Sequence, residues 1–185
     1  IAGEDGTGRE LIARTIHWGS ARDAGRFAVV RCAMLPTDMM SITQRTEALS
    51  QLFGHRREAF IGADDDRDGL IVQAHGGSLF FVEIGLLPMP LQTHLLRVLT
   101  NQQVTPIGAD EGEQVDVRVF ASTSMDLEAQ IEAGAFHREL YDYLAGEVIA
   151  VPPLRERTED IPPLARRFAD EQGEKLGYSS VSLSE

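Results

Sequence analysis

Eight residues near the start of the chain have the types and the spacing of a phosphate-binding loop. Residues 3–10 read GEDGTGRE, in which Gly3 and Gly8 bracket four residues in the pattern G-x-x-x-x-G. Glycines let backbone N–H groups point at phosphate oxygens, and the N-terminus of a following helix adds partial positive charge. Arg9 stands where such loops carry lysine, and its guanidinium keeps the charge but is longer and planar. On the octet alone, a glycine turn that caps a helix stays open as an alternative.

A lone carboxylate, Glu83, follows the apolar run in FFVEIG (residues 80–85). Such a run predicts a buried strand that delivers an acid to a site at its tip. A strand-end site that handles metal and phosphate is expected to carry two adjacent acids, one for the cation and one for the attacking water. Val82 occupies the first position, so the sequence predicts a water-activating acid without the metal's anchor beside it.

The elements that must position these residues alternate between strands and helices. Four short runs rich in Val and Phe have the near-continuous apolarity of strands covered on both faces. Amphipathic stretches lie between them, as in LQTHLLRVLT, where Leu91, Leu95 and Val98 share one helical face. This alternation predicts an α/β domain with a mainly parallel sheet, whose sites lie at the C-terminal ends of the strands. The expected strands are residues 27–32, 79–83, 115–122 and 148–151, and the expected helices are residues 9–18, 91–99, 127–133, 136–144 and 159–176.

Composition limits the class of protein. The 185 residues suffice for one domain with a core, and the single cysteine, Cys32, excludes an internal disulfide, as expected in a reducing cytoplasm. The formal charge of −12 argues against a general basic surface, so we expect DNA contact only through a module outside this chain. No apolar run in the sequence approaches the roughly 18 residues of a membrane helix. Because Ile1 lies almost on the glycine-rich octet, we expect a fragment of a longer protein.

Five motifs follow one another along the chain: GEDGTGRELIARTIH (3–17), LFGHRREAFIGA (52–63), GGSLFFVEIG (76–85), VRVFASTSMDLE (117–128) and VPPLRERTEDIPPLARRF (151–168). The series resembles the central AAA+ ATPase domain of bacterial enhancer-binding proteins, the activators of sigma-54 RNA polymerase. The resemblance implies an AAA+ P-loop NTPase of the α/β class, with a parallel sheet flanked by helices and the start of a helical lid. It also implies ring-shaped homo-oligomers, in which ATP hydrolysis moves a loop carrying GAFTGA against sigma-54.

The resemblance also implies which residues form the sites. An α/β nucleotide-binding subdomain would span residues 1–155, with its first strand preceding Ile1, and the lid would begin over residues 156–185. Glu83 takes the place of the water-activating acid, and Thr123 and Ser124 take that of the sensor. The residues that hold ATP or ADP would be Gly3, Glu4, Asp5, Gly6, Thr7, Gly8, Arg9 and Glu10, and the loop that contacts sigma-54 would be Glu58, Ala59, Phe60, Ile61, Gly62 and Ala63.

The chain departs from the family's pattern at six positions around the nucleotide. Arginine replaces the lysine of the loop, valine replaces the aspartate that positions the metal, and serine replaces the asparagine of the sensor. Histidine and tyrosine replace the two arginines that are supplied to the neighbouring subunit. A second arginine replaces the asparagine that holds the catalytic Glu. An arginine finger is worth roughly 10³–10⁵ in turnover, so this loss alone would bring a modest ATPase near background. We therefore expect impaired or absent hydrolysis, with nucleotide binding retained, weaker dependence on Mg²⁺ and no protein-held metal. The six positions are Arg9, Val82, Ser124, His137, Tyr143 and Arg31.

The remaining departures lie in surface segments. In EAFIGA, Glu58 replaces a flexible glycine and Ile61 replaces a threonine whose hydroxyl is a donor and acceptor. These changes predict impaired contact with sigma-54. Residues 64–69 (DDDRDG) are expected to form a solvated turn, and residues 36–51, which are longer than the corresponding family segment, a polar surface excursion for which partner binding is one hypothesis.

Arg31 and Glu83 lie at the ends of what should be neighbouring strands. Their side chains are predicted to pair, which would satisfy a partly buried charge and occupy the place of the attacking water. The alternative is that Arg31 points to solvent.

These features predict a domain of a cytoplasmic bacterial transcription regulator that binds nucleotide, assembles with copies of itself and signals to DNA-binding and input domains outside this chain. Two alternatives stay open. One is a working sigma-54 activator ATPase. The other is a sensor for cyclic di-GMP, with guanidinium contacts from Arg9, Arg14 and Arg31. No membrane contact is expected.

Overall fold

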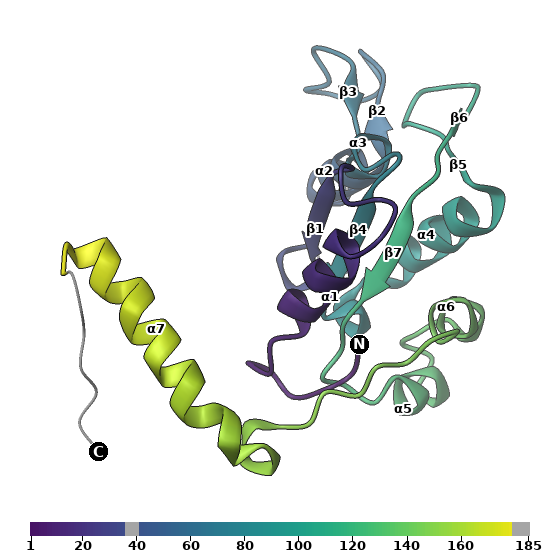
Figure 1. The fold of residues 1–185 in the computed structure, drawn as a ribbon. Coiled ribbons are helices and arrows are strands. Elements are labelled where there is room, and N and C mark those ends of the chain that lie inside the picture. The colour runs from purple at the N-terminus through teal and green to yellow at the C-terminus, as the bar shows by residue number, and fades with distance from the viewer. Residues whose placement is uncertain (36–40, 179–185) are drawn as a thin grey trace.

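A three-stranded parallel sheet forms the centre of the molecule in the computed structural model, which describes residues 1–35 and 41–178. The strands are β1 (Phe27–Arg31), β4 (Ser78–Val82) and β7 (Arg118–Ala121), in the order β1-β4-β7. All three point to the same edge, near which the N-terminus lies (Figure 1). The predicted parallel sheet is confirmed, with each of these strands close to its expected range.

The first residues of the chain extend this sheet beyond β7. Ala2 forms parallel bridges with Thr123 on one side and with Ala150 on the other. The amino group of Ile1 donates a hydrogen bond of 2.7 Å to the Ala121 carbonyl. The strand expected over residues 148–151 is reduced to a single bridge. Within the described chain, Ala150 pairs there with Ala2.

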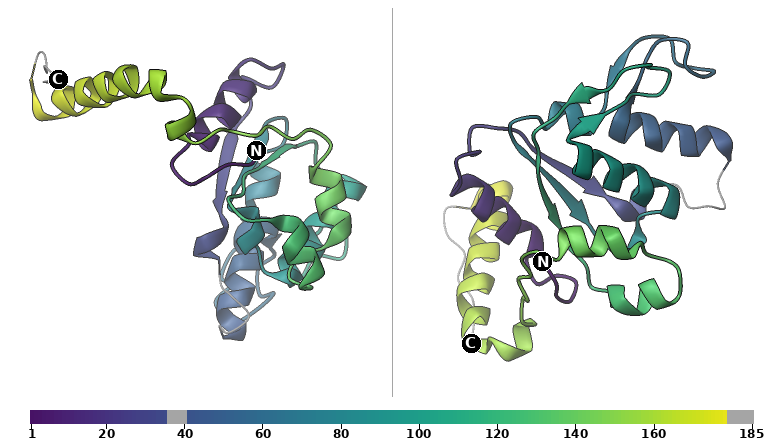
Figure 2. Two further views of the ribbon diagram at one scale, coloured as in Figure 1. Left: turned by 90° about the horizontal axis from the view of Figure 1, so that it is seen from below. Right: turned by 90° about the vertical axis from the view of Figure 1, so that its right-hand side faces the viewer.

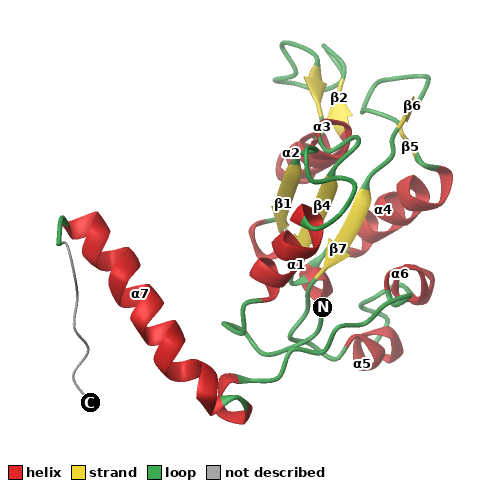
Figure 3. Cartoon of the chain, viewed as in Figure 1, coloured by secondary structure: helices red, strands yellow, loops and turns green. Residues whose placement is uncertain are grey.

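Helices cover both faces of the sheet because β4 is apolar on both (Figure 3). Phe80 packs on one face against Ala13 of α1 (Arg9–Trp18), whereas Leu79 and Phe81 face the main core on the other side. The alternation is what a pleated strand imposes. The helices predicted from periodicity are confirmed to within a few residues. The further elements are η1 (Cys32–Met34), α2 (Ile42–Phe53), α3 (Leu70–Gln73), η2 (Ile84–Leu86), α4 (Met89–Asn101), α5 (Leu127–Glu132) and α6 (Arg138–Leu144).

Helix α2 corrects the expectation of a polar excursion over residues 36–51. Its N-terminus is a capping box, in which Ser41 and Gln44 bond reciprocally to each other's backbone N–H groups. Its inner face buries Ala48 and Leu52 in the main core. The apolar positions recur at helical spacing among polar residues, so the segment forms an amphipathic helix that packs on the core. Residues 36–40 lie outside the described residues.

Two short antiparallel hairpins stand at the end of the sheet opposite to the strand C-termini (Figure 1). One pairs β2 (Gly54–His55) with β3 (Arg67–Asp68), and the other pairs β5 (Gln103–Val104) with β6 (Glu113–Gln114). The two hairpins lie side by side, because His55 bridges to Ile107. Strands of two residues leave no periodic signal, and the sequence analysis did not predict them.

A long helix, α7 (Ile161–Leu176), follows the α/β body and projects away from it (Figures 1 and 2). Two short 3₁₀ turns, η3 (Leu154–Glu156) and η4 (Thr158–Asp160), connect it to the body. Phe168 on α7 is 57% exposed, so the helix leaves apolar surface in solvent. None of the described helices is long and apolar enough to cross a membrane.

Candidate functional site

The predicted phosphate loop, residues 3–10, lies at the C-terminal edge of the sheet. Gly3 N–H donates to the Thr123 carbonyl at 3.2 Å, and the Thr7 hydroxyl donates to the Glu4 carbonyl at 2.8 Å, which closes the loop's own turn. Gly8 caps α1 with a φ of 90°, a left-handed conformation that suits glycine. No side chain of the described residues caps the first turn of α1, whose first N–H groups have no partner within the helix, as an anion site requires.

The side chain of Arg9 is buried under this loop, with 5% of its surface exposed. Its Nη2 lies 2.5 Å from Glu83 Oε1 and donates to Asp5 at 3.2 Å. Two buried atoms, Arg9 Nη1 and Glu83 Oε1, have no hydrogen-bond partner among the described residues. The two side chains thus meet as opposite charges, and Arg9 keeps one donor, Nη1, without a partner among the described residues.

Glu83 is placed by the end of β4 and held by the sensor segment. Its backbone adopts a left-handed φ of 55°, which turns the chain out of the strand into η2. Its Oε2 accepts two hydrogen bonds of 2.9 Å, from the backbone N–H and the hydroxyl of Ser124. The structure therefore brings together the predicted acid, the predicted sensor residue Ser124 and the predicted cation Arg9. Thr123 forms its hydroxyl contacts with Met125 instead.

The predicted pair between Arg31 and Glu83 is wrong. Arg31 is 53% exposed, and its nearest carboxylate is that of Glu10, at 3.6 Å. Glu83 is already paired with Arg9, whose side chain reaches it from the start of α1. Arg31 therefore points largely to solvent, which was the alternative.

Among the described residues, the end of β4 offers a magnesium ion no uncommitted carboxylate. No group of three or more His, Cys, Asp or Glu side chains that could hold a metal occurs in the described part of the chain. Val82 ends β4 without an oxygen ligand, and the carboxylate of Glu83 is engaged by Arg9 and Ser124. Cys32 does not offer a thiolate as a ligand or nucleophile, because burial and the negative charge of Glu83 raise the pKa of its thiol to about 12.

The predicted contact loop forms a tight turn between β2 and β3, at the end of the sheet opposite to residues 3–10 (Figure 1). The Glu58 N–H donates to the Ala63 carbonyl at 2.8 Å, and Glu58 adopts a positive φ of 65°. Phe60 packs against His55 with 5.0 Å between ring centroids, while Ala63 is buried. Ile61 is 99% exposed at the tip of the turn. The loop thus presents one apolar side chain, with an exposed acidic segment, residues 64–66, after it.

Residues 1–150 match the family described as the Sigma-54 interaction domain. The chain belongs to this family. It is 44% identical over 185 residues to the DNA-binding transcriptional regulator NtrC of Proteus hauseri, a match that covers 100% of this chain and 37% of NtrC. It is 42% identical to the Sigma54-dependent transcriptional activator SfnR of Pseudomonas putida, over 100% of this chain and 48% of SfnR. The chain thus spans between a third and a half of the length of these relatives.

Solved structures of NtrX from Brucella abortus share the fold of this sigma-54 interaction domain. One superposes with a TM-score of 0.85 at 33% identity and covers 99% of this chain and 39% of NtrX. The complexes of NtrX with ADP and with ATP give TM-scores of 0.83 and 0.82. The α/β fold of AAA+ P-loop NTPases, predicted from the motifs, is confirmed. Membership of the family gives no support to the expectation that contact with sigma-54 is impaired.

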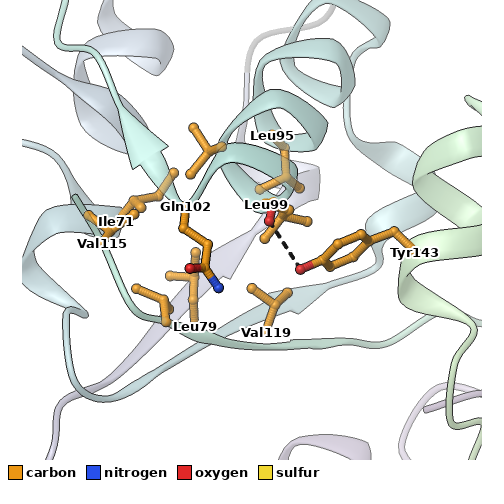
Figure 4. A pocket seen from close by; sticks show the side chains of 10 residues that line it. Ile71, Leu79, Leu95, Leu99, Gln102, Val115, Val119 and Tyr143 are labelled. Carbon is orange, nitrogen blue, oxygen red and sulfur yellow. Dashed lines mark hydrogen bonds between the residues drawn. The ribbon is translucent and has the colours of Figure 1, made fainter. Parts of the chain in front are cut away.

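His137 and Tyr143, the positions at which the resemblance implied arginines, are packed against α4 of the same chain. His137 caps α6, with its Nε2 at 2.9 Å from the Thr93 hydroxyl. The Tyr143 hydroxyl donates to the Leu99 carbonyl at 3.1 Å, and its ring lines a small apolar cavity of about 30 Å³ (Figure 4). Neither side chain offers a positive guanidinium to a neighbour.

Two arginines that were not predicted as site residues contact the phosphate loop. Arg155 donates two hydrogen bonds of 2.7 Å to the carboxylate of Glu4. Arg157 donates one of 2.8 Å to the Thr7 carbonyl. Both come from VPPLRER, the segment that leads to α7. The motif was visible in the sequence, but its contact with residues that lie about 150 positions away was not.

Proposed function

We propose that this chain is the nucleotide-binding AAA+ domain of a bacterial transcription regulator and that residues 3–10 hold the phosphates of ATP or ADP. The observation that carries the proposal is the buried side chain of Arg9, whose Nη1 has no partner among residues 1–35 and 41–178. A buried cation with an unmet donor, set beside the N-terminus of α1, suits an anionic ligand. The structures of NtrX with ADP and with ATP support the same ligand class.

Hydrolysis is the step that these residues support least. Val82 brings no oxygen to a metal ion, and Glu83 is held by Arg9 and Ser124 rather than free to take a proton from water. His137 and Tyr143 supply no guanidinium in trans. Binding in the ground state needs none of these groups, since backbone amides and Arg9 remain. We therefore propose nucleotide binding with slow or absent turnover and little dependence on Mg²⁺.

The alternative is an active sigma-54-dependent ATPase. Its support is the similarity to proteins named as activators, such as SfnR, and the place of Glu83 at the end of β4. For Glu83 to serve as a base in that case, a bound nucleotide would have to draw Arg9 away from it.

A parallel set of titrations tests both possibilities. Calorimetry with ATP and ADP, in Mg²⁺ and in EDTA, is expected to show saturable binding that EDTA changes little. Arg9→Met should abolish it, whereas Arg22→Met, which removes a surface pair with Asp116, should not. Failure of the unaltered chain to bind either nucleotide would overturn the proposal. Phosphate release faster than that of Glu83→Gln would establish the active ATPase instead.

The cyclic di-GMP alternative has weaker structural support. Arg14 donates two hydrogen bonds, of 3.0 and 2.8 Å, to Glu10, and its guanidinium lies 4.6 Å from the centroid of the Phe27 ring. Arg31 approaches the same Glu10. Because one carboxylate engages both arginines, they do not form an open fork together with Arg9. A titration with cyclic di-GMP that competes with ADP would revive this alternative.

We propose that the loop of residues 58–63 meets sigma-54 in this protein as well. The support is its exposed turn with Ile61 at the tip, together with the family to which the chain belongs. The threonine hydroxyl of the family is absent, so the contact at this position would be apolar. Contact with DNA would come through a domain outside this chain, and the protein would act in the cytoplasm as its regulator relatives suggest.

We further propose a division into a nucleotide-binding body, residues 1–155, and the beginning of a lid, residues 156–185. The 3₁₀ turns η3 and η4 and the projecting α7 support a boundary at this place. A groove of about 390 Å³, lined in part by Ile1, Ala121 and Val148, could accept a strand that precedes Ile1. Further copies of the chain would assemble into a ring of the kind that the family resemblance implies. Hydrogen exchange that is as slow across α7 as across β4 would contradict the division.

A further inference from the structure

We propose that Arg155 and Arg157 are positioning residues that couple the orientation of α7 to the shape of the phosphate loop. The inference rests on the proposed nucleotide binding and adds a means of controlling it. Its basis is that the segment between the body and α7 braces the loop from outside, although α7 itself projects away (Figure 2).

The bracing contacts fall on the residues that close the loop's own turn. The Thr7 hydroxyl and the Glu4 carbonyl hold that turn together at 2.8 Å. Arg155 grips the Glu4 carboxylate with two hydrogen bonds, and Arg157 donates to the Thr7 carbonyl. A shift of the segment therefore moves both ends of the turn at once, and with it the amides that would face phosphate.

A third contact lies at the start of the loop. The Val151 N–H donates to the Ala2 carbonyl at 2.8 Å, and a methyl group added at Gly3 would stand 2.8 Å from the Val151 carbonyl oxygen. The backbone before the two arginines is thus packed on the loop without a gap. Gly3 is required here because backbone of the segment occupies the place of a side chain.

The connection from these arginines to α7 is short and stiff. Arg157 also lies 3.5 Å from Asp160, the residue that precedes α7, and Pro162 follows in the first turn of the helix. Proline fixes its own φ, which removes one of the torsions through which α7 could turn independently of η4. By linkage, a ligand that orders the loop must favour one orientation of α7, and the reverse.

The two arginines differ in expected weight. Arg155 and Glu4 are both more than half exposed, so their pair is screened by water, although its bidentate geometry holds the pKa of Glu4 below its usual range. Arg157 is 26% exposed and bonds to backbone. We therefore expect the loss of Arg157 to disturb the phosphate loop more than the loss of Arg155.

Hydrogen exchange on the chain without nucleotide tests the positioning directly. Arg157→Met should speed exchange of the Gly3 and Thr7 amides, which both donate to backbone carbonyls, by about tenfold, the factor for one lost hydrogen bond from a charged donor. Arg155→Met should speed it by about two- to fivefold, as for an exposed pair. Arg167→Met is the matched control, because it removes an exposed ion pair with Glu171 within α7 and should leave the loop unchanged. Wild-type exchange in both Arg155 and Arg157 variants would overturn the inference.

Binding of ADP then tests the coupling. ADP should slow exchange in the first turn of α7 in the unaltered chain, and Arg157→Met should weaken ADP binding about tenfold and remove that protection. A charge exchange, Glu4→Arg with Arg155→Glu, should recover much of the affinity that either change loses, which would show that the two side chains act as a pair. If ADP binds normally to Arg157→Met, the coupling is wrong. If the unaltered chain binds no ADP, the proposed function fails, while the exchange result without nucleotide still decides the positioning.

Discussion

Arg9 and Glu83 form a buried ion pair beside the phosphate loop. A buried guanidinium must find a negative partner, because the solvation that it loses is large. With valine at position 82, the carboxylate within reach on β4 is that of Glu83. Arg9 therefore engages, together with Ser124, the one carboxylate that the end of β4 presents among the described residues.

This pair predicts strong coupling between two substitutions. Arg9→Met should lower the free energy of unfolding by about 3 kcal/mol, because it leaves a buried carboxylate without its cation. Glu83→Gln should do the same from the other side, and the double variant should cost clearly less than the sum, as measured by urea unfolding.

The control for this cycle is the exposed pair of Arg167 and Glu171, whose removal should cost about 1 kcal/mol or less. Additive effects at Arg9 and Glu83 would show that the two side chains do not depend on one another.

The sequence predicted that several residues of this candidate site would lie close together, but not which side chains would pair. The glycine spacing gave the loop, and the strand ends brought Glu83 and Ser124 to the same edge, because parallel strands finish together. Which arginine reaches Glu83 could not be read from the sequence, since Arg9 and Arg31 both lie near it. The choice depends on the buried path of one side chain from α1, and that is a tertiary property.

Helix α2 shows the same limit for an element. The sheet strands, α1 and α4 were predictable because their apolar residues recur at the period of the element. In α2 the signal was present, with Ser41 and Gln44 in a capping box and Ala48 and Leu52 four residues apart. The many polar residues between these apolar positions made the segment look like a surface excursion. The two hairpins are too short to carry any period.

The cap and the core face of α2 should contribute separately to stability. Ser41→Ala removes the capping box and should cost about 1 kcal/mol. Leu52→Ala opens a cavity in the main core, where Leu52 is 2% exposed, and should cost about 2–5 kcal/mol. Ile42→Ala, at a 78% exposed position of the same helix, is the control and should change little. Thermal or urea unfolding in which Leu52→Ala matched Ile42→Ala would contradict the packing of α2.

At the scale of the whole molecule, the two candidate sites lie at opposite ends of the sheet. The phosphate loop lies where the strands finish, and the turn between β2 and β3 stands beyond the other end (Figure 1). Glu83, Arg155 and Arg157 contact residues of the loop. The second hairpin supports that turn, because Arg56 pairs with Glu113 at 2.7 Å and Gly108 leaves room for Ala59. Any signal from nucleotide to the turn must therefore travel through the body rather than by direct contact.

This separation predicts that Ile61→Asp affects one end only. The side chain of Ile61 is 99% exposed, so the change should leave stability and ADP affinity as they are. Burial of an isoleucine at an interface is worth about 1.5–3 kcal/mol, so binding to purified sigma-54, measured with ADP or ATP present, should weaken by roughly tenfold or more. Ile42→Asp places the same charge at another exposed isoleucine and should bind normally. Equal binding by both variants would mean that the turn is not the contact surface, and a loss of ADP affinity in Ile61→Asp would mean that the two ends are not independent.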